Sequence, residues 1–118
     1  MSHYQMGVLE TRFAKIIWEN EPLSSGQLVG LAAQELNWKK STTFTVLRRL
    51  CDKGIFQNNK GTVTSLLSPD QYATVQSTQF VNEAFCGSLP AFLAAFTAGR
   101  KLTEEEISEL RDIIKSQE

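Results

Sequence analysis

The sequence has few of the residues that build metal sites and enzyme active sites. Its 118 residues include one histidine, His3, and two cysteines, Cys51 and Cys86, which lie far apart. They form neither a Cys-x-x-Cys pair nor a set of zinc ligands, and free cysteines usually behave as small apolar side chains. The chain also lacks a Ser/His/Asp constellation and a glycine-rich phosphate-binding loop. We therefore expect no metal, no cofactor and no enzymatic activity.

Long hydrophobic runs are missing as well. No apolar stretch approaches the roughly 18–20 residues that a membrane span needs. The first residues, MSHYQMGVLE, contain no hydrophobic segment of a secretory signal. Hydrophobic residues make up 42% of the chain and charged residues 21%, which is typical of a folded protein. These features predict a cytoplasmic protein with no membrane partner.

The charge of the chain is small in total but unevenly distributed. The formal net charge is −1, yet six of the 12 lysines and arginines lie between Lys39 and Lys60, with a single acid, Asp52, among them. Residues 36–66 carry a net charge of +5, whereas residues 67–118 carry −4. Separated charge of this kind directs an anionic ligand to one surface. The alternative is an ordinary solvated helix face, so the context of the basic cluster decides its meaning.

The first part of the chain has the pattern of two amphipathic helices. In VLETRFAKIIWENEP the apolar residues recur at helical spacing, and Pro22 ends the helix. In SSGQLVGLAAQEL, Ser24 and Gln27 fit a capping box, which satisfies amide groups at a helix start. The residues that we expect to face inward are Leu9, Phe13, Ile16 and Ile17 in the first helix, and Leu28, Leu31, Ala32 and Leu36 in the second.

The segment KKSTTFTVLRRLCDKG places the basic cluster on a third predicted helix. An apolar stripe runs from Thr43 to Leu50, and Gly54 stands where a left-handed helix end is expected. The opposite face carries hydroxyl and basic side chains. The following residues, IFQNNKGTVTSLLS, are typical of two short strands around a turn at Asn58–Gly61. Three helices followed by a β-hairpin predict a winged helix-turn-helix domain over residues 1–68.

A helix of this composition suits the major groove of DNA, where each base pair presents a distinct set of hydrogen-bond donors and acceptors. Short polar side chains near the helix start can reach base edges, while cations neutralise phosphates. Phe44 is ambiguous, because its ring can contact a base methyl group or pack against the second helix. The predicted DNA-binding residues are Lys39, Lys40, Ser41, Thr42, Phe44, Thr45, Arg48, Arg49, Lys53 and, on the wing, Lys60.

Residues 69–118 have the pattern of three more helices, two of them opened by the capping boxes SPDQ and TEEE. About fifty residues bury too little surface to be stable as a separate monomer. They can fold back on the first domain or pair with a second copy. We favour pairing, because the first domain has its own core and two-fold dimers are the commonest oligomers. The residues expected at the dimer interface are Phe80, Val81, Phe85, Leu89, Phe92, Leu93, Phe96, Leu110, Ile113 and Ile114.

Two stretches of the chain resemble one protein family. WENEPLSSGQLVGLAAQELNWKKSTTFTVLRRLCDKG is similar to the winged-helix domain of the BlaI/MecI/CopY penicillinase-repressor family. FVNEAFCGSLPAFLAAFTAGRKLTEEEISELRDII resembles the dimerisation arm of that family, so the resemblance extends from about Val8 to Lys115. It implies a homodimeric transcriptional repressor that binds a palindromic DNA operator. It also implies that base-reading residues lie between Ser41 and Thr45, with a basic residue at Arg49.

The resemblance further implies a route of induction. In the resistance repressors of this family, a sensor-protease cuts the dimerisation arm at a bond that aligns with Ala95–Phe96 here; position 95 is Ala where those repressors have Asn. The copper-responsive branch carries a cysteine-rich C-terminal tail, whereas this chain ends in KSQE. The alternative function is a winged-helix protein-interaction module without DNA binding, in which the acids of Glu104–Glu106 face a basic partner.

Overall fold

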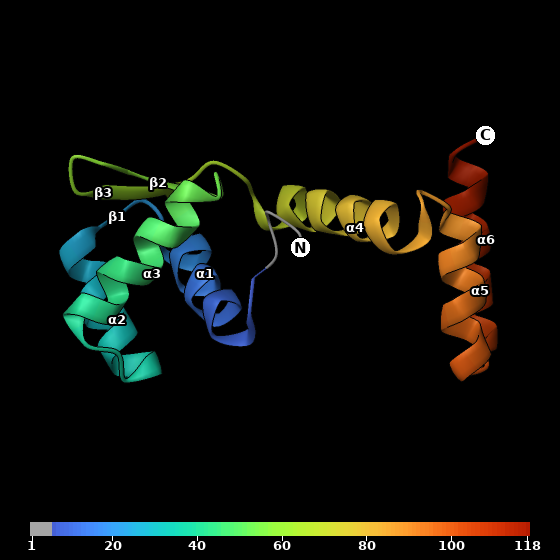
Figure 1. Cartoon of the computed structure of the whole chain (residues 1–118), viewed down its shortest axis with the longest axis horizontal. Helices are drawn as coiled ribbons and strands as arrows, with labels where there is room; N and C mark the ends of the chain where they lie inside the picture. Colours follow the sequence, from blue (N-terminus) through green and yellow to red (C-terminus); the bar gives the residue numbers. More distant parts are fainter. Residues whose placement is uncertain (1–5) are drawn as a thin grey trace. The chain divides into compact units, whose positions relative to one another are not determined.

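The computed structural model describes residues 6–118, so His3 lies outside the described residues (Figure 1). The chain divides into two compact units, Met1–Gln79 and Phe80–Glu118, which we call the N-terminal and C-terminal units. The prediction of a mostly helical fold with a small β wing is confirmed. The elements are α1 (Val8–Asn20), β1 (Leu23–Ser24), α2 (Ser25–Leu36), α3 (Lys40–Asp52), β2 (Phe56–Asn59), β3 (Thr62–Ser65), α4 (Pro69–Phe85), α5 (Leu89–Gly99) and α6 (Glu104–Ser116).

The core of the N-terminal unit is built from one face of each of its first three helices. α1 buries Phe13 and the residues around it, as its periodicity predicts. The prediction for Leu9 is wrong: its side chain is 52% exposed. Leu9 lies in the first turn of α1, and the buried residues of that helix begin one turn later, at Phe13. The full set of buried side chains in the three helices is Phe13, Ala14, Ile16, Ile17, Leu28, Ala32, Thr43, Val46, Leu47 and Leu50.

A side-chain cap begins α2 and a left-handed residue ends it. The Ser24 hydroxyl accepts a hydrogen bond from the Gln27 amide at 3.0 Å, and the Gln27 side chain accepts one from the Ser24 amide at 2.8 Å, so the predicted capping box is confirmed. α2 ends at Asn37, whose φ of 57° is one that asparagine tolerates better than most residues. This turn directs the chain into α3.

The wing is a three-stranded sheet rather than the simple hairpin expected from the sequence. β2 and β3 pair antiparallel, with Phe56 opposite Ser65, and the turn between them has positive φ at Lys60 and Gly61. β1 pairs with the free side of β3, which gives the order β1-β3-β2. Close by, the Ser25 amide donates to the Gly61 carbonyl at 2.8 Å. The start of α2 is therefore fastened to the tip of the wing.

Two further contacts tie α1 to the chain that follows the wing. The Glu21 carboxylate accepts hydrogen bonds from the Ser65 amide and hydroxyl at 2.8–2.9 Å. The Trp18 indole donates to the Leu67 carbonyl at 2.9 Å. Both join residues more than 40 positions apart. They hold β3 against α1 and so fix the wing relative to the helices of this unit.

The C-terminal unit consists of the end of α4 together with α5 and α6. The turn after α4 has positive φ at Cys86 and Gly87, and Ser88 then caps α5 by accepting from the Ala91 amide at 3.1 Å. The rings of Phe80, Phe85 and Phe92 meet edge to face with centroids 5.5–6.1 Å apart. None of the α5 or α6 residues is buried among the described part of the chain.

A length and hydropathy criterion for membrane-crossing helices is not met by any single helix of residues 6–118. α4 and α5 satisfy it only as a pair, bent by 83° at the break between them.

Candidate functional site

α3 has two faces of opposite character. Thr43, Val46, Leu47 and Leu50 are buried against the other helices and the sheet. Residues three and four positions apart lie on the same side of a helix, so Ser41, Thr45 and Arg48 share the opposite side. All three are exposed. The predicted division of this helix into a core stripe and an open polar face is confirmed.

Two threonine hydroxyls of α3 donate to the helix backbone. Thr43 Oγ1 donates to the Lys39 carbonyl at 3.2 Å, which satisfies a hydroxyl that is fully buried. Thr45 Oγ1 donates to the Ser41 carbonyl at 2.9 Å, although Thr45 is exposed. The second bond fixes the orientation of a side chain in the centre of the open face.

Five of the predicted phosphate-binding cations surround this open face or stand on the wing. Each is exposed, and none forms an ion pair with another of residues 6–118. The Asn58 side chain accepts from the Gly61 amide at 3.0 Å and so shapes the turn that carries Lys60. These cations are Lys39, Lys40, Arg48, Arg49 and Lys60.

Of the other predicted contacts, Thr42 is exposed, whereas Lys53 and Phe44 have different surroundings. The Nζ atom of Lys53 lies 3.5 Å from Glu10 Oε2, and the Lys53 side chain is only 20% exposed. Its charge is therefore compensated by a carboxylate of α1. Phe44 is half-buried and packs against the core, which was one of the two alternatives for this ring. Both residues connect α3 to the rest of its own unit.

Asp52 also lies on the open face of α3, although it is not among the predicted DNA-binding residues. It is exposed and stands one helical turn after Arg48, in line with Thr45. A carboxylate there repels phosphates and can accept a hydrogen bond from a cytosine amino group. Its spacing of four from Arg48 was the signal in the sequence that could have identified it.

The two cysteines differ in burial, and only Cys51 has the partly buried position expected of a small apolar side chain. Burial raises the pKa of the Cys51 thiol, with the neighbouring Asp52 carboxylate as a second cause, so this side chain stays protonated near neutral pH. Cys86 is exposed. Within residues 6–118, no three His, Cys, Asp or Glu side chains are placed to hold a metal ion.

The C-terminal unit carries an apolar face. Half of the predicted interface residues, Phe80, Leu89, Phe96, Ile113 and Ile114, are 46–59% exposed, and the other half, Val81, Phe85, Phe92, Leu93 and Leu110, are half-buried. α5 and α6 line a groove of about 280 Å³, with Phe92 and Phe96 on one side and Leu110 and Ile113 on the other.

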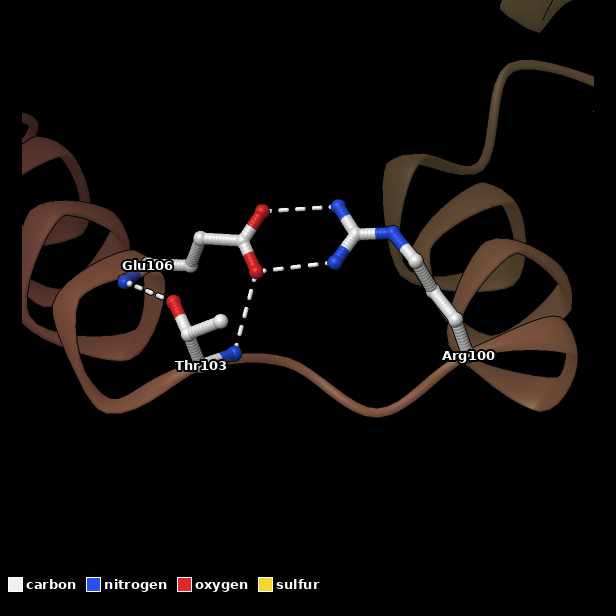
Figure 2. A network of polar contacts seen from close by, with 3 residues as sticks. All are labelled: Arg100, Thr103 and Glu106. Atoms are coloured by element: carbon white, nitrogen blue, oxygen red, sulfur yellow. Dashed lines mark hydrogen bonds and ion pairs between the residues drawn. The ribbon is translucent and has the colours of Figure 1, made fainter.

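A polar network of Arg100, Thr103 and Glu106 joins the end of α5 to the start of α6 (Figure 2). Arg100 and Glu106 also line the groove. The Arg100 guanidinium donates two parallel hydrogen bonds to the Glu106 carboxylate, at 2.9 and 2.7 Å, and lies 4.9 Å from the centre of the Phe96 ring. The Glu106 carboxylate also accepts from the Thr103 amide at 3.0 Å, while the Thr103 hydroxyl accepts from the Glu106 amide. The Arg100 hydrogen bonds, followed by the Thr103 amide, lower the pKa of Glu106 to about 2.

These features define a winged-helix protein with an open, basic recognition helix and a separate helical unit that bears an apolar face. The sequence model of the family described as penicillinase repressor matches residues 6–116, and the chain belongs to this family. The family is one of transcriptional repressors and not of enzymes, in agreement with the two predictions made from the sequence.

Individual relatives are similar along nearly their whole length. The penicillinase repressor of Bacillus licheniformis is 26% identical over 94% of this chain and 90% of its own. The methicillin resistance regulatory protein MecI of Staphylococcus aureus (strain Mu50 / ATCC 700699) is 25% identical over 94% of both chains. MecI of Mammaliicoccus sciuri is 24% identical with the same coverage. The matched stretch of this chain therefore includes most of both the N-terminal and the C-terminal unit.

Proposed function

We propose that the protein is a homodimeric transcriptional repressor that inserts α3 into the major groove of a palindromic DNA operator. The observation that carries this proposal is the open face of α3, where hydroxyl side chains are flanked by cations, in a chain of the penicillinase repressor family. Ser41, Thr42 and Thr45 reach base edges, because they are short, polar and close to the start of the helix.

The exposed cations have the complementary role of contacting phosphates. Arg48 and Arg49 flank the groove from α3, while Lys60 extends from the wing to a neighbouring phosphate. We assign Lys53 and Phe44 to holding α3 in place, since the first is paired with Glu10 and the second packs on the core. A protein that contacts DNA in this way acts in the cytoplasm, where the chromosome of a bacterium lies.

Dimerisation follows from the small size of the C-terminal unit. Phe80–Glu118 contains no buried residue in α5 or α6 among the described residues, so the unit lacks a core of its own. Chains of about this size usually need an additional source of stability, and oligomerisation is one. A second copy of the same face covers both apolar surfaces at once by two-fold symmetry. We propose residues 1–68 for DNA binding and residues 69–118 for dimerisation, with Tyr72 anchoring the start of α4 in the N-terminal core.

DNA binding is tested with a double variant, Arg48→Ala with Arg49→Ala, on DNA from the protein's own promoter. We expect at least a tenfold loss of affinity and a salt dependence that is weaker by about two phosphate contacts, since each neutralised phosphate adds about 0.9 to the slope. The matched control is Lys15→Ala with Lys101→Ala, which removes two exposed charges elsewhere. Affinity that ignores salt, or equal affinity of both double variants, would contradict the proposal.

The alternative of a protein-interaction module has less support. Of the three acids proposed to meet a basic partner, Glu106 is already paired with Arg100. Glu104, Glu105 and Glu106 occupy the first turn of α6, where the helix dipole favours acids without any partner. A partner pull-down that survives the Arg48/Arg49 double variant, in a protein that binds no DNA, would favour this alternative.

A sensor-protease remains a proposed partner for induction. Ala95 and Phe96 are exposed, but both lie within α5. Proteolysis occurs preferentially in open, irregular segments, so cleavage at this bond requires α5 to unwind locally. Replacing Gly99 with Ala, which favours the helix, slows such cleavage if it proceeds through unwinding.

A further inference from the structure

The hydroxyl of Thr45 can act only as a hydrogen-bond acceptor towards the outside of α3. Its Oγ1 donates to the Ser41 carbonyl at 2.9 Å. A threonine hydroxyl has one O–H donor and two acceptor lone pairs. Because the donor is used within the helix, the side chain offers an acceptor oxygen and a methyl group to whatever faces it.

This orientation is a consequence of the position of Thr45 in the helix. β-branched side chains have few allowed rotamers in a helix, and one threonine rotamer bonds the carbonyl four residues earlier. Thr43 adopts the same arrangement with the Lys39 carbonyl. Ser41 and Thr42 lie in the first turn of α3, and within residues 6–118 neither hydroxyl donates to a carbonyl as those of Thr43 and Thr45 do. Their hydroxyls therefore keep the freedom to donate or to accept.

The base edges in the major groove also differ in whether they donate or accept a hydrogen bond. Adenine and cytosine present an amino group, N6 or N4, that donates, whereas guanine O6 and thymine O4 accept. We propose that Thr45 is a specificity-determining residue that selects an amino base, adenine or cytosine, over a keto base at the operator position that it faces. An acceptor oxygen opposite a keto oxygen leaves two acceptors without a proton between them. This inference rests on the proposed function.

The test compares the base preferences of the native protein and a variant that lacks only the hydroxyl. Thr45→Val has nearly the same shape and keeps a methyl group, and Thr45→Ala serves as a second variant that a helix tolerates easily. Thr74→Val is the matched control, because Thr74 is an exposed threonine of α4 whose hydroxyl donates in the same way to the Asp70 carbonyl, at 3.0 Å. Each protein is used to select from a random DNA pool, and its affinity is then measured for the selected operator with all four bases at every half-site position.

We expect one half-site position at which the native protein prefers adenine or cytosine by about five- to tenfold, the size of one hydrogen bond. Thr45→Val and Thr45→Ala lose the preference at that position alone, and Thr74→Val keeps it. Unchanged preferences in the Thr45 variants, a native preference for a keto base there, or a uniform loss of affinity at all positions overturns the inference while palindrome binding still supports the proposed function. A native protein that selects no sequence and binds without salt dependence overturns both.

Discussion

The helices of the two units begin with similar side-chain caps, but their apolar side chains are buried to different extents. In both units, helices begin with side-chain caps, such as Ser24 in α2 and Thr103 in α6. Yet every buried apolar residue of the described chain lies between Met6 and Tyr72. In the C-terminal unit, Phe80 is 52% exposed and Ile113 is 59% exposed. The comparison shows that caps and periodicity specify helices, whereas burial requires a second surface.

In the N-terminal unit that second surface comes from the same chain. Phe56 of β2 is fully buried and its ring lies 5.3 Å from that of Trp18 in α1, so the wing completes the helical core. In the C-terminal unit, the phenylalanine rings contact one another but stay accessible. The proposed second copy supplies there what the sheet supplies in the N-terminal unit.

The largest expected effect is on the stability of the N-terminal unit and tests whether the wing completes its core. Phe56→Ala removes a fully buried ring, and such changes lower the free energy of unfolding by about 3–5 kcal/mol. Both tryptophans, Trp18 and Trp38, belong to the N-terminal unit, so tryptophan fluorescence during urea denaturation reports on this unit. A loss below about 1 kcal/mol, the range of an exposed position, would show that the wing does not complete the core.

The next effect tests the apolar face of the C-terminal unit. Ile113→Asp places a carboxylate on the apolar face of α6, where the proposed dimer would bury it without a partner. We expect the dissociation constant of the dimer to rise about 100-fold or more, because a buried unpaired charge is strongly unfavourable. Sedimentation velocity measures the dissociation, and the tryptophan-monitored unfolding of the N-terminal unit stays unchanged.

The control for this variant is Ser108→Asp, which adds the same charge at an exposed polar position of α6. It should leave dimerisation intact. If Ile113→Asp sediments like the native protein, or if the native protein is monomeric, the apolar face has another role.

The same comparison explains what could be predicted from the sequence. The capping box at Ser24, the buried stripe from Thr43 to Leu50 and the turn at Lys60–Gly61 depend on residues a few positions apart. Local spacing is enough to specify them. The exposed cations of α3 followed from the same stripe, because the side opposite a buried face is open.

Features that depend on distant residues could not be predicted in this way. β1 has two residues and exists because β3 offers it a free edge. Its Leu23 pairs with Val63, which lies far outside any local window of the sequence. The pairing of Lys53 with Glu10 joins the end of α3 to the start of α1, and no spacing rule connects them. Leu9 has the periodicity of a core residue but lies beyond the part of α1 that is covered.

Removal of a cap should have a smaller effect, with a different concentration dependence in each unit. Ser24→Ala and Thr103→Ala each remove a hydroxyl that accepts from an amide in the first turn, which typically destabilises by about 1 kcal/mol. Thermal unfolding of the N-terminal unit in Ser24→Ala shifts equally at all protein concentrations. In Thr103→Ala the loss appears as weaker dimerisation and shrinks as the protein concentration rises. Identical concentration dependence for the two variants would remove the distinction between the units.

The smallest expected effect is on dimerisation at acidic pH. The folded-state pKa of Glu106 is lowered from 4.5 to about 2 by Arg100, so its contribution to stability is complete above pH 4.5 and is lost as the pH falls to about 2. Glu106→Gln keeps a side chain that can complete the capping box of α6 but removes the charge. Dimerisation of the variant, followed by sedimentation between pH 4.5 and 2, should therefore depend less on pH than that of the native protein. Because Glu106 is solvent-exposed, this difference is screened by salt and should decrease at high ionic strength. Two identical pH profiles would mean that the ion pair does not hold α5 and α6 in the arrangement that the apolar face requires.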